Sequence, residues 1–212
     1  MLKVNIMPLG RMSVNCYIVY DEDTHDGAVI DPGGEDSADA IAARCRSLGV
    51  NVKYILLTHA HFDHILSLEA LRKILNVPVA IHADDADALC DPLLTYMAQF
   101  GGVSKDISPA EMLLDEGSQI TLGAHTLTVM HTPGHTMGSV CYKTDGIIFT
   151  GDTLFGGSIG RCDLYGGDED AIEDSLKRLV RLEGDYKIYP GHGGTTTMER
   201  QRQTNLYVRH LQ

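Results

Sequence analysis

The stretch Thr58-His59-Ala60-His61-Phe62-Asp63-His64 holds four possible metal ligands within six residues. It directly follows an apolar run, 54–57, that is typical of a buried strand, and it precedes a segment, 65–75, that is typical of a helix. On extended backbone His59 and His61 point to the same side, because side chains alternate along a strand. We therefore expect these ligands to converge where a strand ends and a helix begins.

Imidazole groups suit zinc, iron and nickel, and an added carboxylate favours a hydrolytic or iron-type site over a purely structural one. A lone His-x-His pair is often a surface accident without any metal, so the pattern needs support from elsewhere in the chain. Three more candidates follow other apolar runs, each beside a glycine that permits close backbone approach: His135, Asp152 and His192. Seven such positions together favour a metal centre over chance.

These motifs resemble those of the metallo-β-lactamase superfamily, and within it those of the short, single-domain glyoxalase II-like hydrolases. The likeness runs along nearly the whole chain, through Asn15-Cys16-Tyr17, Asp31-Pro32-Gly33-Gly34 and Gly160-Arg161-Cys162-Asp163 to the segment 195–205. It implies an α/β fold, the four-layer αββα metallo-β-lactamase sandwich. Periodicity alone supports only a layered α/β protein.

The chain has 212 residues, which is long enough to bury a substantial core. We expect a single domain over residues 1–212 with two similar halves, about 1–118 and 119–212. Family members that bind glutathione carry an extra helical domain at the C-terminus. The sequence stops 20 residues after His192, so we expect no C-terminal glutathione-binding domain.

The formal net charge of −12 argues against nucleic acid or an anionic membrane as a partner. No apolar run is long enough to span a membrane, and the first residues do not look like a signal peptide. The five cysteines are scattered and contain no Cys-x-x-Cys pair, which is typical of reduced thiols in a cytoplasmic protein. We expect a cytoplasmic protein with a small-molecule partner, and the sequence leaves the oligomeric state open.

The resemblance implies two divalent metal ions per chain, with zinc in first place and iron or manganese as alternatives. Seven residues would bind these ions in two groups that share one bridging carboxylate: His59, His61 and His135 in one, Asp63, His64 and His192 in the other, and Asp152 between them. Asp63 is also the predicted catalytic residue, since it could orient the attacking hydroxide and shuttle a proton.

Arg161 is a candidate substrate-binding residue, because a guanidinium group suits a substrate carboxylate. A salt bridge between Arg161 and Asp163 is an equally good interpretation. Asp31 fits a buried carboxylate in a turn better than a catalytic acid.

The implied activity is hydrolysis of a thioester of the hydroxyacylglutathione type by a metal-bridging hydroxide. One alternative is hydrolysis of another ester or of a lactone at the same site. A second is an oxygenase resembling persulfide dioxygenases, with a single iron at the His59, His61, Asp152 end of the cluster. Asp152 stands where the antibiotic-hydrolysing branch has Cys or Ser, which argues against that branch.

Three further expectations concern local structure. Asp36 or Ser37 is expected to cap the helix that follows it. Residues 83–118 should contain a short helix over 83–90, followed either by a lid over the site or by a further packed helix. A last helix near the C-terminus is expected to carry Leu206, Val208 and Leu211.

Overall fold

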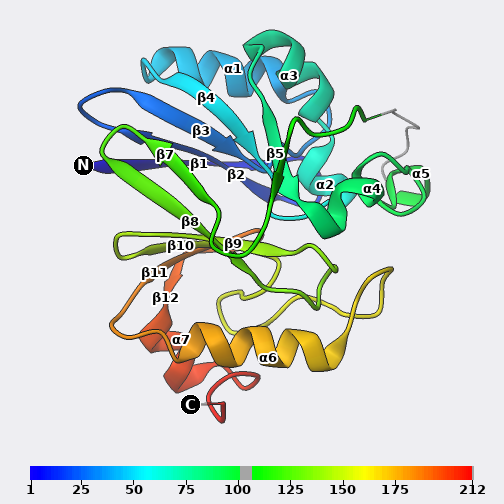
Figure 1. Cartoon of the computed structure of the whole chain (residues 1–212), viewed down its shortest axis with the longest axis vertical. Coiled ribbons are helices and arrows are strands. Elements are labelled where there is room, and N and C mark those ends of the chain that lie inside the picture. The colour runs from blue at the N-terminus through cyan, green and yellow to red at the C-terminus, as the bar shows by residue number, and fades with distance from the viewer. Residues whose placement is uncertain (101–106, 212) are drawn as a thin grey trace.

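The computed structural model describes residues 1–100 and 107–211, and its core is two six-stranded sheets packed face to face (Figure 1). Residues 101–106 of the segment 83–118, for which a lid or a further helix is expected, lie outside the described part. The first sheet has the spatial order of its strands in the chain: β1 (Leu2–Leu9), β2 (Val14–Asp21), β3 (Asp26–Ile30), β4 (Asn51–Leu56), β5 (Val79–His82) and β6 (Met112–Leu114). β3 to β6 run parallel, so β4 and β5 end at the same edge of the sheet.

In the second sheet, too, strands that are neighbours in the chain are neighbours in space. Its strands are β7 (Gln119–Leu122), β8 (His125–His131), β9 (Val140–Thr144), β10 (Ile147–Gly151), β11 (Lys187–Pro190) and β12 (Thr196–Thr197). β9 and β10 form the antiparallel hairpin that the Asp145-Gly146 turn predicts. β10 and β11 are parallel neighbours, so Asp152 and His192, which follow them, leave the sheet at one edge.

Helices cover the outer face of each sheet and complete four layers (Figure 1). α1 (Ala38–Ser47) and α3 (Leu68–Leu75) cover the first sheet, and α6 (Glu169–Val180) and α7 (Met198–Thr204) cover the second. Buried apolar side chains form three clusters, one between the two sheets and one beneath each helical layer. The predicted αββα sandwich is confirmed.

The segment after the first ligand strand differs from the single helix predicted over 65–75. It is divided into α2 (Phe62–Ile65) and α3, with Ser67 between them. Asp63 and His64 therefore lie within a helical turn, which fixes the directions of both side chains. Ser37 precedes α1, but its side chain caps no helical N–H, because its hydroxyl donates to the carbonyl of Glu35 at 3.2 Å.

Two other segments also depart from prediction. The expected helix over 83–90 is a 3-10 turn, η1 (Ala83–Asp85), followed by α4 (Ala86–Leu89), and α5 (Met97–Phe100) comes after it. α7 ends at Thr204 because Asn205 adopts an extended conformation, so the expected helical positions Leu206, Val208 and Leu211 lie beyond the helix. Val208 and Leu211 are nevertheless buried under the second sheet.

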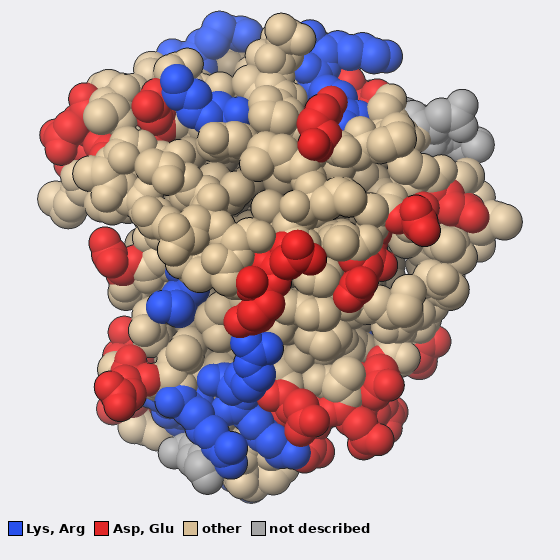
Figure 2. Space-filling model, in the orientation of Figure 1, with Lys and Arg blue, Asp and Glu red and all other residues tan. Residues whose placement is uncertain are grey.

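The surface carries charge of both signs. In Figure 2 Lys and Arg side chains gather at the top and near the bottom of the molecule, while Asp and Glu are spread over the same face and also flank the lower basic group. Within residues 1–100 and 107–211, none of the helices has the length and apolar character needed to cross a membrane.

Candidate metal centre

The structure brings all seven predicted ligands together at the edge of the two sheets. His59 and His61 follow β4, and Asp63 and His64 lie in α2. His135 lies in the loop between β8 and β9, and Asp152 and His192 follow β10 and β11. Three sets within this cluster have potential ligand atoms within 4.8 Å of one another: His59, His61 and His135; His59, His64 and Asp152; and Asp63, His64 and His192.

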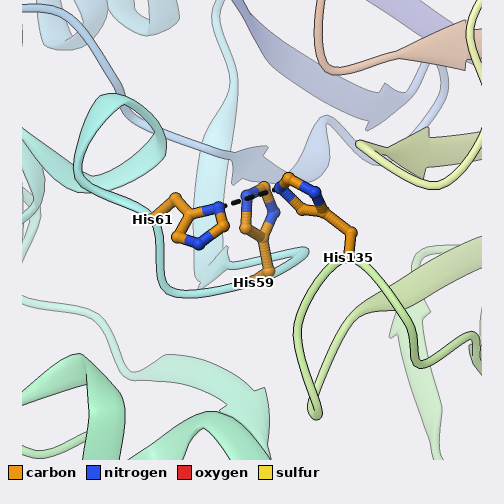
Figure 3. A group of neighbouring side chains, drawn as sticks. All are labelled: His59, His61 and His135. Carbon is orange, nitrogen blue, oxygen red and sulfur yellow. Dashed lines mark hydrogen bonds between the residues drawn. The ribbon is translucent and has the colours of Figure 1, made fainter. Parts of the chain in front are cut away.

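Asp152 lies between the two predicted ligand groups. Its Oδ1 is 3.4 Å from Nε2 of His64, while its Oδ2 is 3.7 Å from Nε2 of His135 and 3.5 Å from Nε2 of His192. Asp63 lies on one side only, with Oδ2 3.1 Å from Nε2 of His192. Figure 3 shows the other side, where the rings of His59, His61 and His135 converge and Nδ1 of His61 lies 2.8 Å from Nε2 of His135.

Four histidines are oriented by contacts on the side of the ring that faces away from the cluster: His135, His192, His64 and His59. Nδ1 of His135 donates to the Arg161 carbonyl at 2.7 Å, and Nδ1 of His192 donates to the Met12 carbonyl at 3.1 Å. These acceptors assign the proton to Nδ1 and leave the Nε2 lone pair facing the centre. His61 is the exception, because its Nδ1 faces the cluster.

A second pair of outer contacts ends at Asp31, which is buried. Its Oδ2 is 2.9 Å from Nδ1 of His64 and accepts the Thr58 hydroxyl at 2.7 Å. The Thr58 oxygen lies 3.0 Å from Nδ1 of His59 and can accept its proton. Asp31 thus orients ligands in both groups, which is the role of a positioning carboxylate.

The inner atoms of the cluster fit metal ions. Nε2 of His59, Nε2 of His64 and Oδ1 of Asp152 are buried and have no hydrogen-bond partner among the described residues. An unsatisfied buried polar atom costs about 1–3 kcal/mol, so several in one place indicate a missing partner. Three nitrogens on one side, two nitrogens and a carboxylate on the other, and a shared carboxylate are the donor set of catalytic zinc and iron sites.

The charges of the cluster favour neutral histidines on one side. Burial, together with the neighbouring histidines, lowers the pKa of His61 to about 3 and that of His59 well below its ordinary value. Burial alone would also lower the pKa of His64, but Asp152, Asp63 and Asp31 outweigh it and raise that pKa well above its ordinary value. A metal ion and a proton compete for Nε2 of His64, because only the deprotonated ring nitrogen binds a metal.

Close approach at the centre depends on Gly191. A Cβ atom at this position would lie 2.0 Å from Oδ1 of Asp152 and 2.8 Å from Cε1 of His64. Only glycine leaves room for the backbone here. The β2 strand supports the same loop, since the Asn15 backbone N–H donates to the Gly191 carbonyl at 2.7 Å and its side chain donates to the carbonyls of Pro190 and Gly193.

Sequence reasoning missed Asp85, a buried carboxylate at the end of η1. It accepts the hydroxyl of Thr136 at 2.9 Å and the N–H of Gly138 at 2.7 Å, and so holds the loop that carries His135. It follows a buried strand, as Asp152 does, but no histidine motif or glycine turn adjoins it. That signal is too weak to single out one acid among 29.

A cavity of about 630 Å³ opens onto the cluster. Five of the ligands face it, together with Arg161 from the loop between β10 and α6: His61, Asp63, His135, Asp152 and His192. Arg161 forms the alternative salt bridge, with Nε and Nη2 each 2.7 Å from a carboxylate oxygen of Asp163.

Tyr96 also lines the cavity, and sequence reasoning assigned no individual role to it. Its ring packs edge-on against His61 with the centroids 5.8 Å apart, and its hydroxyl accepts the Tyr165 N–H at 2.7 Å. Its φ of 61° is unusual for a large side chain, and such strain is often found at functional sites.

His82, Asp84 and His131 form a separate cluster. The two rings are stacked with their centroids 3.9 Å apart, so their lone pairs do not converge. Nδ1 of His82 already accepts the Asp84 N–H, and Nε2 of His131 lies 2.8 Å from the Met137 carbonyl. These contacts are ordinary hydrogen bonding.

Comparison with known proteins agrees with this geometry. The chain is 31% identical to the hydroxyacylglutathione hydrolase GloC of Haemophilus influenzae, over 98% of both chains. Among solved structures, BLEG-1 B3 metallo-beta-lactamase is 35% identical with a TM-score of 0.89 and covers 98% of this chain and 99% of its own.

Two further solved structures match nearly the whole chain. TTHA1623 in a di-iron-bound form is 35% identical, with a TM-score of 0.84 over 96% of this chain and 100% of its own. ETHE1 from Myxococcus xanthus is 25% identical, with a TM-score of 0.82 over 98% of this chain and 85% of its own. The family model of the metallo-beta-lactamase superfamily matches residues 9–192, which include all seven ligands. The chain belongs to the metallo-β-lactamase superfamily.

Proposed function

We propose that the protein is a dinuclear metal hydrolase that cleaves thioesters of the hydroxyacylglutathione type. The observation that carries this proposal is the position of Asp152, whose carboxylate lies between the two ligand groups: Oδ2 is 3.7 Å from His135 of one group and 3.5 Å from His192 of the other, and Oδ1 is 3.4 Å from His64. A carboxylate shared in this way is what a two-metal hydrolytic site requires. The likeness to GloC supports the choice of substrate.

His59, His61 and His135 would hold one ion, Asp63, His64 and His192 the other, and Asp152 would bridge them. When bound, such ions supply an acidified water as nucleophile and polarise the carbonyl that it attacks. Zinc is our first choice, with iron and manganese as alternatives, and the di-iron form of TTHA1623 supports iron.

Asp63 would orient the attacking water and accept its proton at a carboxylate oxygen, because it faces the cavity and is held 3.1 Å from His192. A thiolate is a weak base and leaves without a strong acid, so a thioester suits a site with no dedicated proton donor. The apolar walls of the cavity would exclude bulk water from the reacting carbonyl. The partner is a small molecule, and we propose no nucleic acid or membrane partner and a cytoplasmic location.

The test combines metal content per chain with hydrolysis of S-D-lactoylglutathione, on protein purified with and without air. About two metals and turnover, both lost in Asp152→Asn, are the expected result. Two metals per chain with no turnover of this or other thioesters would refute the thioesterase proposal. Ester and lactone substrates, and a β-lactam because of the likeness to BLEG-1, then identify which bond the site cleaves.

The likeness to ETHE1 favours one second candidate, an oxygenase of the persulfide dioxygenase type with a single iron at the His59, His61, Asp152 end of the cluster. One iron per chain, oxygen uptake with glutathione persulfide and an untouched thioester would establish this candidate instead.

A further inference from the structure

The cavity above the metal centre is mainly apolar. Its aliphatic and aromatic lining comes from both halves of the chain and includes Leu9, Met12, Phe62, Tyr96, Phe100 and Leu164. Met12 is 58% exposed and Phe100 is 65% exposed, although both are large apolar side chains beside a functional site. A ligand that covered them would remove apolar surface from water, so the cavity suits a substrate with an apolar body.

Among residues 1–100 and 107–211, the lysine and arginine side chains that face this cavity are Arg11 and Arg161. Arg161 is already neutralised by its bidentate contact with Asp163. A substrate anion that bound Arg161 would have to compete with the Asp163 carboxylate, which lies 2.7 Å from its Nε. The predicted substrate contact is therefore the weaker of the two candidates.

Arg11 has no such competitor. Its side chain is exposed, and within the described ranges it makes neither an ion pair nor a side-chain hydrogen bond. Glu35 faces the same cavity, but no ion pair within 4.0 Å joins it to Arg11. A guanidinium group with five free N–H donors is the group that best matches a carboxylate.

The backbone of Arg11 is held firmly beside the metal centre. Arg11 lies in the turn between β1 and β2, which the Ser13 N–H closes onto the Gly10 carbonyl at 3.3 Å. The next residue, Met12, accepts the hydrogen bond from the ligand His192. A free side chain on a fixed backbone, next to the reacting centre, is the arrangement of a substrate contact.

We propose that Arg11 binds the anionic end of the substrate, and that the substrate class is a thioester with an apolar acyl group and a carboxylate on its thiol. This inference rests on the proposed function. A net charge of −12 repels anions at long range. The positive charge of Arg11 beside the cavity opposes this repulsion locally and attracts an anionic substrate.

The experiment uses the metal-loaded protein and a matched pair of substrates. S-pentanoyl-3-mercaptopropionate carries one carboxylate, and S-pentanoyl-3-mercaptopropionamide is its neutral counterpart. We expect the wild type to prefer the anionic member in kcat/KM. In Arg11→Gln this preference should fall about tenfold through a higher KM, a typical value for a lost charge-assisted hydrogen bond in a partly exposed place.

Arg46→Gln is the matched control, because Arg46 is an exposed arginine of α1 outside the cavity and its loss changes the net charge equally. We expect it to keep the preference. Arg11→Lys should retain part of it, and salt should weaken it in the wild type far more than in Arg11→Gln. An unchanged preference in Arg11→Gln, or its loss in Arg161→Gln instead, would overturn the proposal.

Failure of the proposed function is distinguishable from failure of this inference. If the wild type hydrolyses neither thioester, calorimetry with the inert thioethers 3-(pentylthio)propanoate and 3-(pentylthio)propanamide replaces the kinetics. Tighter binding of the anionic thioether that Arg11→Gln abolishes would support the anion contact without any turnover. Equal binding of the two thioethers to the wild type would refute it.

Discussion

Oδ2 of Asp85 lies 3.0 Å from the backbone nitrogen of Ala60, the residue between the ligands His59 and His61. Because the same oxygen accepts the Thr136 hydroxyl, one buried carboxylate joins the ligand loop of the first sheet to that of the second. An amide in its place would turn a donor toward backbone N–H groups that need an acceptor.

We therefore expect Asp85→Asn to weaken metal binding by about 10–100-fold, the usual effect of losing a partner that orients metal ligands. Competition with a chromophoric chelator measures this. Asp85→Glu, which keeps the carboxylate, should recover part of the affinity. Metal affinity equal to that of the wild type in Asp85→Asn would show that the loops hold their positions without it.

Asp21→Asn is the matched control for that experiment. Asp21 is also a buried carboxylate and accepts the N–H groups of Asp23, Thr24 and Ala124. It ends β2, seven residues from Val14, which pairs with His192, so it lies about 23 Å from that ligand along the strand. We expect this variant to lower the free energy of unfolding and to leave the metal affinity unchanged.

Asp21 also predicts a pH dependence. Hydrogen bonds from the backbone of Ala124, Asp23 and Thr24 lower its pKa to about 2, compared with about 3.9 in an unfolded chain. Its stabilising effect is therefore complete above pH ~4 and is lost as the pH falls through the folded value. Urea midpoints of wild type and Asp21→Asn, measured in chelator, should differ by a constant amount from pH 7 to pH 5 and converge below pH 4.

The contact between Gly191 and Asp152 yields a steric prediction. In Gly191→Ala the new methyl group must push Asp152 or the loop away, and we expect a loss of metal affinity and of hydrolysis of at least about tenfold, as for other misplaced catalytic ligands. Gly194→Ala is the control, since a Cβ there meets nothing within 4 Å. Similar losses in both variants would point to loop flexibility, and not to this contact, as the cause.

Metal removal should destabilise the whole protein, because the ligands come from both sheets. A ligand that binds only the folded state stabilises it by about 2.7 kcal/mol at a concentration 100 times its Kd. We expect the thermal midpoint to fall on addition of chelator and to recover with zinc, manganese or ferrous iron in the order of their affinities. Calorimetric scans at several metal concentrations test this, and a midpoint independent of metal would contradict it.

The ligands were predictable because their pattern is local. His59, His61, Asp63 and His64 fall in one short stretch, and the other three follow strands next to glycines. The fold followed from the family resemblance. The β9–β10 hairpin was predictable from its turn alone, because Asp145-Gly146 fixes the pairing of its neighbours.

Contacts between distant segments were not predictable in the same way. Asp85 contacts Ala60 and Thr136, which are 25 and 51 residues away in the chain, so no local pattern connects them. β6 is a three-residue edge strand, too short for an alternating pattern to stand out. α7 ends at Thr204, but Val208 and Leu211 are buried from the irregular segment that follows it, and burial without periodicity imitates a helix in a sequence.

The distance along the chain between the first and last ligands has a consequence for biosynthesis. His59 and His192 are 133 positions apart, and the loop of His192 is held by β2 near the beginning of the chain. At roughly 5–20 residues per second, a ribosome needs about 7–27 s to pass from one to the other. During that time His59 to His64 exist without His192, so the complete set of seven ligands can assemble only after the last strands have been made.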